Sequence, residues 1–261
     1  PRGTMDLARE AGVSAGVVRG LAKNGALRQV SLPAWQAPER PDWRLPRATL
    51  STDQRTTADS LVARIRETRF SVTLLDGVTG SGKTEVYFEA VAAALKGDKQ
   101  ILVLVPEIPL AGQWLERFTE RFSVAPAIWH SDLAQGKRRA AWRAVVDHGA
   151  HVVVGARSTL FLPFPNLGLI IVDEEHEPAY KQEETPRYHG RDVAVYRAKL
   201  NNAACILGSA TPSLESMRNA QVGKYELATL TKRVDDRSLP TVHLVDMRRE
   251  LLKTGFTQVL S

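Results

Sequence analysis

Residues 74–84 read LLDGVTGSGKT, with Gly77, Gly82, Lys83 and Thr84 at the fixed positions of the spacing G-x-x-x-x-G-K-[ST]. An apolar run immediately precedes the loop, so the local order is strand, loop and helix. Because glycine lacks a Cβ atom, successive backbone N–H groups in such a loop can point at phosphate oxygens, and the N-terminus of the following helix adds partial positive charge. The pattern therefore predicts a nucleotide site.

The loop residues have distinct expected roles. Lys83 is expected to reach the β- and γ-phosphates of ATP, and the hydroxyl of Thr84 is expected to ligate Mg²⁺. The residues expected to cradle the phosphates are Gly77, Thr79, Gly80, Ser81 and Gly82. The alternative interpretation is an ordinary Gly/Ser turn beside a surface lysine.

Composition limits the class of protein. The 261 residues contain one cysteine, Cys205, which excludes a disulfide within the chain and a four-cysteine zinc site. The six histidines show no metal-ligand spacing in the sequence, so no zinc is expected. The longest apolar runs, 101–105 and 167–172, are too short to span a bilayer, and the N-terminus lacks the apolar segment of a signal peptide. We therefore expect a cytoplasmic protein without membrane contact.

The first fifth of the chain carries most of the excess positive charge and has its own pattern of helices. Residues 1–50 carry eight Lys or Arg and four Asp or Glu, a net charge of +4 out of +6 for the whole chain, which favours a polyanionic partner. Residues 1–32 are typical of a winged helix, with helices expected at 5–11 and 15–23, capped by Thr4 and Ser14, and a possible wing at 26–32. A small helical appendage that packs Leu7, Val18 and Leu21 on its neighbour would show the same pattern.

A proline-rich segment follows. Residues 33–50 contain four prolines, which exclude a helix or an inner strand and indicate a linker. Its two tryptophans, Trp35 and Trp43, are expected to pin the segment to the body of the protein.

Residues 51–232 alternate between short apolar strands and amphipathic helices. This alternation predicts an α/β fold, with a parallel sheet covered by helices on both faces and ligands at the carboxyl ends of the strands. Strands are expected at 72–76, 101–105, 127–130, 152–154, 168–172, 204–207, 226–230 and 241–245. Helices are expected from Ser51 or Thr52 to Arg66, and at 83–95, 110–122, 136–146, 190–200 and 212–220.

Two further strand ends carry candidate catalytic groups. Residues 169–176 read LIIVDEEH, an apolar strand that ends in three carboxylates; Asp173 is assigned to Mg²⁺ and Glu174 to the attacking water. A strand end solvated by charge is the alternative. Residues 207–212 read LGSATP, where Ser209 and Thr211 could hydrogen-bond both the acidic strand end and neighbours that move.

These three segments, in this order, resemble the core motifs of superfamily 2 helicases. Gln54 would then correspond to the adenine-reading glutamine of that superfamily, although an exposed helical glutamine would look the same in the sequence. The match narrows to the PriA family, the primosomal replication-restart DNA helicases of bacteria. The segments that carry this closer resemblance are 77–87, 105–108, 129–131, 155–158, 173–176, 180–182, 187–189, 191–192 and 209–213.

The resemblance implies an ATP-dependent 3′-to-5′ DNA helicase or translocase of stalled forks, at the bacterial nucleoid. Its implied partners are single-stranded and forked DNA, single-strand binding protein and other primosome proteins. Residues 51–232 would form the first RecA-like lobe, and 233–261 a truncated connection towards a missing second lobe.

The resemblance also assigns residues to DNA and to coupling. Pro106, Gly155, Arg157 and Ser158 would hold the single-strand backbone, and Glu107 would order a loop. An aromatic-rich loop would contact DNA through Tyr180, Lys181, Arg187, Tyr188 and Arg191, with His176, Ser209 and Thr211 coupling the DNA to hydrolysis. Tyrosines simply packed under a surface loop are the alternative.

The sequence departs from the family pattern in three respects. It lacks the zinc-binding cysteines, the N-terminal domain for capturing a 3′ end, and a second lobe with an arginine finger, a group that supplies roughly 10³ to 10⁵ in rate. We therefore expect a fragment that binds ATP weakly and hydrolyses it poorly alone. Two other hypotheses remain: a DNA-binding scaffold module with a vestigial nucleotide site, and another superfamily 2 translocase such as a restriction or remodelling subunit.

Overall fold

The computed structural model describes residues 4–28, 39–46, 48–106 and 112–234. Its centre is a seven-stranded sheet of order β3-β4-β2-β5-β8-β1-β9, in which every neighbouring pair is parallel. The strands are β1 (Ser71–Gly77), β2 (Gln100–Leu104), β3 (Ala127–Trp129), β4 (Val152–Gly155), β5 (Leu167–Val172), β8 (Ala204–Ser209) and β9 (Glu226–Leu230). A short antiparallel pair, β6 (Lys181–Gln182) and β7 (Tyr188–His189), lies outside this sheet.

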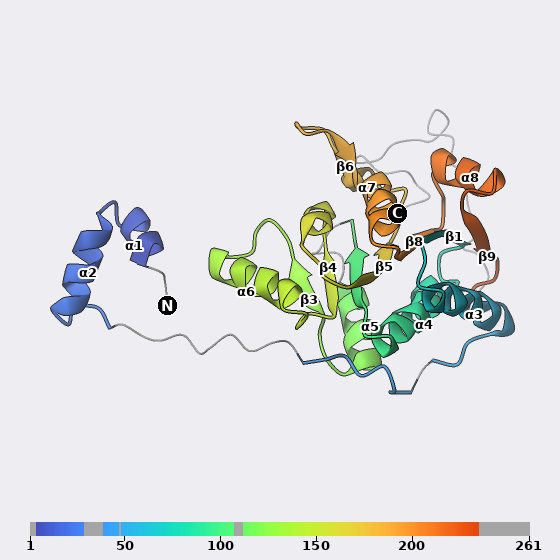
Figure 1. Ribbon diagram of the computed structural model, residues 1–261, viewed down its shortest axis with the longest axis horizontal. Coiled ribbons are helices and arrows are strands. Elements are labelled where there is room, and N and C mark those ends of the chain that lie inside the picture. Colours follow the sequence, from blue (N-terminus) through green and yellow to red (C-terminus); the bar gives the residue numbers. More distant parts are fainter. Residues whose placement is uncertain (1–3, 29–38, 47, 107–111, 235–261) are drawn as a thin grey trace, which may run out of the picture.

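Helices cover both faces of the sheet (Figure 1). On one face pack α3 (Thr52–Arg66), α4 (Lys83–Lys96) and α5 (Gly112–Phe122). On the other pack α6 (Gln135–Val146), α7 (Gly190–Leu200) and α8 (Leu214–Gln221), together with the short 3₁₀ helix η2 (Arg157–Phe161). A second 3₁₀ helix, η3 (Pro178–Tyr180), precedes β6. The predicted α/β class and its RecA-like arrangement are confirmed.

The central strands are mostly apolar because both faces of the sheet are buried. In β2, Ile101 and Val103 belong to the core shared with α3, α4 and α5. The alternate residues Leu102 and Leu104 belong to the core shared with α6 and α7. Successive side chains of a strand point to opposite faces, so a continuous apolar run fills two cores at once.

Two N-terminal helices, α1 (Thr4–Glu10) and α2 (Ala15–Lys23), pack against each other through the buried residues Ala8 and Val18. Thr4 is the first residue of α1, not a cap outside it, and α1 ends one residue earlier than expected. Ser14 occupies the N-cap of α2 with an extended backbone, yet its side chain makes no capping hydrogen bond. Residues 26–28 form no strand, and the rest of the expected wing lies outside the described residues, so the winged helix is not confirmed.

Residues 39–46 of the proline-rich segment lie against α4 and α5. The backbone N–H of Asp42 donates to the carbonyl of Phe122 at 3.0 Å, and Arg121 Nη1 donates to the carbonyl of Leu45 at 3.1 Å. The Trp43 ring packs on the core and faces the Lys96 ammonium, 5.4 Å from the ring centroid. The expectation that Trp43 pins this segment is confirmed, whereas Trp35 lies outside the described residues.

Helix α3 begins as the sequence predicts, with Ser51 at its N-cap. The strand expected at 241–245 lies outside the described residues. Among the helices that the structure describes, none is long and apolar enough to cross a bilayer.

Candidate nucleotide site and its coupling network

The phosphate loop joins β1 to α4 at the carboxyl edge of the sheet. Gly80 and Gly82 have positive φ values of 79° and 82°, a region that favours glycine. A Cβ atom at Gly82 would lie 2.4 Å from Gln54 Nε2, and one at Gly77 would lie 2.6 Å from Ser81 Oγ. The loop therefore needs its glycines both for backbone conformation and for close packing.

Lys83, the first residue of α4, points its ammonium back over the loop. Its Nζ donates to the carbonyl of Gly77 at 2.7 Å and lies 4.0 Å from Glu174 Oε1. The side chain is buried, so the ammonium is held within the loop it is expected to serve. Phosphate oxygens entering the loop can accept these hydrogen bonds in place of the carbonyl.

Gln54 connects α3 to the phosphate loop. Its Oε1 accepts from the backbone N–H of Ser51 at 2.8 Å, completing a capping box, and its Nε2 donates to the carbonyl of Ser81 at 2.8 Å. The side chain is only 7% exposed. The alternative of an exposed helical glutamine is wrong, and Gln54 lies beside the loop as the helicase resemblance implies.

Asp173 and Glu174 follow β5 and face the loop. Burial, with the charge of Glu174 adding to it, raises the pKa of Asp173 from 3.8 to about 6, and the Lys83 ammonium opposes this shift. The Tyr87 hydroxyl donates to Asp173 Oδ2 at 3.4 Å and accepts from Trp114 Nε1 at 2.6 Å. Glu174 has a positive φ of 46°, unusual for a residue with a Cβ atom. The site therefore contains the carboxylates of Asp173 and Glu174 and, near them, the buried ammonium of Lys83.

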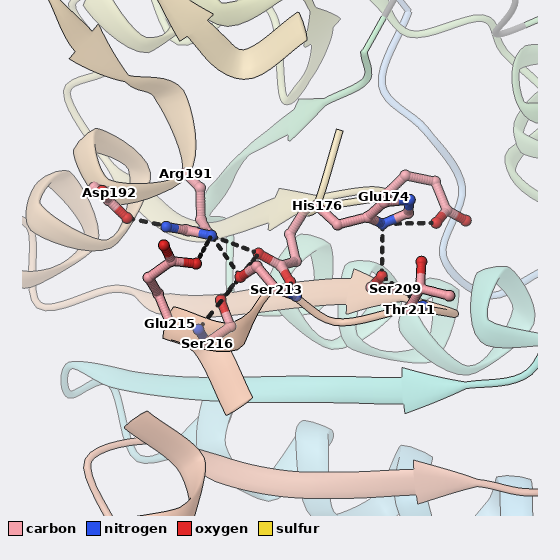
Figure 2. A network of polar contacts seen from close by, with 10 residues as sticks. Glu174, His176, Arg191, Asp192, Ser209, Thr211, Ser213, Glu215 and Ser216 are labelled. Carbon is pink, nitrogen blue, oxygen red and sulfur yellow. Dashed lines mark hydrogen bonds and ion pairs between the residues drawn. The ribbon is translucent and has the colours of Figure 1, made fainter. Parts of the chain in front are cut away.

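A polar chain joins the end of β5 to the end of β8. His176 Nδ1 lies 2.7 Å from Ser209 Oγ and 3.6 Å from Glu174 Oε2, and Ser209 Oγ accepts from the backbone N–H of Thr211 at 3.0 Å. Figure 2 shows His176 between Glu174 and Ser209. The structure thus brings together the three residues expected to couple the motifs.

A second network surrounds Glu175, which the sequence analysis missed. Its carboxylate is fully buried and accepts from the Ser213 backbone N–H at 2.7 Å, from the Ser213 and Ser216 hydroxyls at 3.0 and 2.9 Å, and from Arg191 Nη1 at 3.2 Å. Figure 2 shows Arg191 between Asp192 and Ser213, the N-cap of α8. The sequence did carry a signal for Glu175. Of the three consecutive carboxylates, the metal ion was assigned to Asp173 and the water to Glu174, so the third had no role.

Two of the expected DNA contacts are not supported by this placement. Arg191 is 6% exposed, and its guanidinium is engaged by Glu175, Asp192 and Ser213. Tyr180 is 1% exposed, and its hydroxyl donates to the carbonyl of Asp173 at 2.6 Å. Both side chains are buried and hydrogen-bonded within the fold. For Tyr180, this placement agrees with the alternative interpretation of a tyrosine packed under a surface loop.

Gly155 and Arg157 order the segment that follows β4. A Cβ atom at Gly155 would lie 2.3 Å from the Trp129 carbonyl oxygen, so glycine is required for packing there. Arg157 Nη1 donates to the carbonyls of Ala179 and Lys181 at 3.0 and 2.5 Å and so ties η2 to β6. Ser158, the second residue of η2, is exposed, and Glu107 lies outside the described residues.

The remaining expected DNA residues form a surface that also includes a residue missed from the sequence. Lys181, Arg187 and Tyr188, together with Gln182 and Glu183, line a groove of 480 Å³. The Tyr188 ring packs edge-on against Phe161, with centroids 5.5 Å apart, and Phe161 is 63% exposed. We call Phe161, Lys181, Arg187 and Tyr188 the groove surface. An aromatic residue close to Arg157 was the sequence signal for Phe161.

Outside this site, the fold places two histidines near a carboxylate, an arrangement that the sequence alone did not indicate. His148 and His151 lie together with Asp98 in an arrangement that could hold a metal ion. The two histidines lie close together in the sequence, whereas the carboxylate of Asp98 comes from a different turn. Only the fold brings the three ligands together.

Comparison with known proteins supports the helicase resemblance. The family profile described as DEAD/DEAH box helicase matches residues 52–220. Curated relatives include proteins described as "Replication restart protein PriA" from Bacillus subtilis (strain 168), 42% identical over 94% of this chain and 31% of the relative, and from Chlamydia pneumoniae, 41% identical over 97% and 34%. The chain spans about a third of the length of these relatives.

Solved structures support the fold. "Structure of RecG bound to three-way DNA junction" aligns with a TM-score of 0.56 and 22% sequence identity over 77% of this chain and 27% of that one. At this identity the likeness concerns the arrangement of strands and helices. Together with the relatives, it confirms the similarity that the motifs predicted.

Proposed function

This chain belongs to the DEAD/DEAH box helicase family, and from that premise we propose that it is the first motor lobe of an ATP-dependent DNA helicase or translocase of replication restart, moving 3′ to 5′. The support for replication restart is the description of its relatives at 41–42% identity. Single-stranded and forked DNA would be the substrates, and single-strand binding protein and primosome proteins the partners. This role places the protein in the cytoplasm, at the nucleoid.

The observation that carries the proposal is the convergence of Lys83, Asp173 and Glu174 at the phosphate loop. Lys83 would bind the β- and γ-phosphates, as its buried ammonium already lies over the loop. Glu174 would orient the attacking water and accept its proton. The side chain of Gln54 would hold the loop in position and contact the adenine end of the nucleotide.

The residues present fit a magnesium ion. Asp173 has a raised pKa because it is buried beside another carboxylate, so a divalent cation there would supply the missing positive charge and favour the ionised form. Thr84 and Asp173 would hold this ion, which neutralises charge on the phosphates when bound. The resulting role of the protein groups is to position phosphate, water and cation.

The coupling chain gives a route from nucleotide to DNA. Glu174 contacts His176, and His176 contacts Ser209, so a shift of Glu174 on loss of the γ-phosphate would change the hydrogen bonding at the end of β8. Arg157 ties the segment after β4 to the aromatic-rich loop and so connects two parts of the DNA-contacting side. DNA would lie on Ser158 and the groove surface.

Hydrolysis of ATP by the full-length protein tests the proposal. We expect single-stranded DNA to stimulate hydrolysis, and Lys83→Ala and Glu174→Gln each to reduce it by about 10²-fold or more. Lys199→Ala, an exposed change on α7, is the matched control for loss of a lysine. Unchanged hydrolysis in Lys83→Ala would overturn the motor. DNA binding with no hydrolysis at all would favour the scaffold hypothesis, and absence of a preference for forked DNA would favour another translocase.

A further inference from the structure

Three potential metal ligands meet at the edge of the sheet opposite the phosphate loop. Asp98 lies in the turn between α4 and β2, and His148 and His151 lie between α6 and β4. Since β2 and β4 are parallel neighbours, their amino ends lie side by side. The cluster therefore joins two turns about fifty residues apart in the sequence, far from the groups proposed to bind ATP.

The distances suit a common ligand. His151 Nε2 lies 3.6 Å from Asp98 Oδ1, and His148 Nε2 lies 3.9 Å from Asp98 Oδ2. One ligand atom from each residue lies within 4.8 Å of the others. Ligand atoms around a tetrahedral zinc ion, with bonds of about 2.0–2.2 Å, are separated by about 3.3 Å. The ligand atoms would therefore have to approach one another by up to about 1.5 Å, which rotations of the three side chains can supply.

The two imidazoles have unsatisfied nitrogens. His148 Nε2 and His151 Nδ1 are buried, and neither has a hydrogen-bond partner within the part of the chain that the structure describes. Their rings are close, with centroids 5.1 Å apart and planes at 73°. A buried polar atom without a partner destabilises the folded state by roughly 1–3 kcal/mol, so a bond to a metal at His148 Nε2 would remove such a cost.

The carboxylate has an alternative partner. Arg40 Nη2 lies 2.8 Å from Asp98 Oδ1 and also donates to the carbonyl of Leu95 at 3.1 Å. Arg40 belongs to the segment that lies against α4 and α5. A cation bound by Asp98 and the histidines would compete with this guanidinium by charge and by position.

We propose that Asp98, His148 and His151 form a second metal site, which takes a divalent transition metal, with Arg40 as its competitor. Two imidazoles and a carboxylate suit zinc, and a water molecule would complete four-coordination. Magnesium, the ion of the nucleotide site, prefers oxygen ligands and would not occupy this one. Binding would clamp the α4–β2 turn to the α6–β4 turn and free Arg40.

The test is a Zn²⁺ titration of the metal-free chain by calorimetry, with Co²⁺ absorption as a second readout. We expect one equivalent of Zn²⁺ to bind, and we expect the affinity to be at least about tenfold lower in the double variant His148→Asn/His151→Asn. His130→Asn, a histidine outside the cluster, is the matched control. Lys83→Ala should leave zinc binding unchanged, which separates this site from the proposed function.

Arg40→Ala keeps all three ligands and gives a result that misfolding cannot imitate. Removal of the competing guanidinium should raise zinc affinity several-fold, and should raise the melting temperature in saturating zinc relative to the same variant without metal. No binding of zinc by the unmodified chain would overturn the proposal. The same holds for an unchanged affinity in the double variant, or for weaker binding in Arg40→Ala.

Discussion

Glu175 is a fully buried carboxylate that neutralises the buried guanidinium of Arg191. Glu175→Gln keeps the shape but leaves that guanidinium without its buried counter-charge, so we expect the free energy of unfolding to fall by about 3 kcal/mol. Urea unfolding followed by circular dichroism measures this change. Asp192→Asn removes the other carboxylate bonded to Arg191 from a side chain that is 62% exposed, and should cost under about 1 kcal/mol. Equal losses in the two variants would contradict the assignment of Glu175 as the main partner.

Asp173 should destabilise the metal-free protein at neutral pH. Its pKa is about 6 in the folded protein against 3.8 as a reference, so the folded state holds the proton more tightly than the unfolded state. Stability therefore falls as pH rises between these values, and the penalty stays at its full size above them. Asp173→Asn should raise the free energy of unfolding by roughly 1–3 kcal/mol at pH 8, and this gain should shrink as pH falls from about 6 to about 4.

The measurement for Asp173 is urea unfolding at several pH values in the presence of a chelator. Asp59→Asn, an exposed change on α3, serves as the control for loss of one carboxylate. A gain in Asp173→Asn that is the same at every pH would show that the carboxylate is not held with a raised pKa.

At the residue scale, the sequence predicts which chemistry is present but not always where a side chain points. The loop glycines, Lys83 and Asp173 are specified by local spacing, and they lie together because their strands end at one edge of the sheet. Arg191 and Tyr180 look like surface residues in the sequence because a cation and an aromatic suit DNA. Their burial depends on Glu175 and on the Asp173 carbonyl, partners that only the three-dimensional packing supplies.

At the element scale, the groove surface should bind single-stranded DNA by stacking and charge. Phe161→Ala removes an exposed ring that packs on Tyr188, and we expect DNA affinity to fall by about 1–3 kcal/mol. Arg187→Ala should weaken binding and reduce its salt dependence, because a phosphate contact releases counterions. Fluorescence anisotropy with labelled oligonucleotides at several salt concentrations measures both effects. Leu200→Ala, at an exposed apolar position on α7, is the control.

A Phe161→Ala variant that binds DNA as tightly as the Leu200→Ala control would show that DNA takes another path. A salt dependence unchanged in Arg187→Ala would remove this arginine from the contact. Either result would contradict DNA binding by the groove surface without contradicting the nucleotide site, because neither residue lies at the phosphate loop.

The helices and strands were predicted well where burial gives the sequence a periodic pattern of apolar residues. The strand Glu226–Leu230 and the helix Gly190–Leu200 have the bounds expected from the sequence. The β6–β7 pair was missed because two residues per strand leave no periodic signal. Of the wing expected at 26–32, residues 26–28 form no strand, and the rest lies outside the described residues.

At the scale of the whole molecule, the order of the strands explains the contact between His176 and Ser209. β8 lies between β1, which leads into the phosphate loop, and β5, which ends at Asp173. Ser209 is therefore placed beside both motifs and can meet His176. Sequence order alone does not predict this arrangement, because β8 is inserted between two strands that precede it in the chain.

The position of the phosphate loop at an edge of this lobe predicts how the chain behaves alone. In the proposed function, Lys83, Asp173 and Glu174 would supply one side of the site, whereas the transition state of phosphoryl transfer commonly needs an additional arginine, worth roughly 10³ to 10⁵ in rate. We expect the 261-residue chain to bind ATP, with hydrolysis at least about 10³-fold slower than in a full-length protein that contains it. Calorimetric ATP binding and steady-state hydrolysis, each with Lys83→Ala as control, measure the two properties separately. Equal hydrolysis by both proteins would mean that this lobe holds a complete active site, and loss of ATP binding in the short chain would mean that the loop itself depends on the missing part.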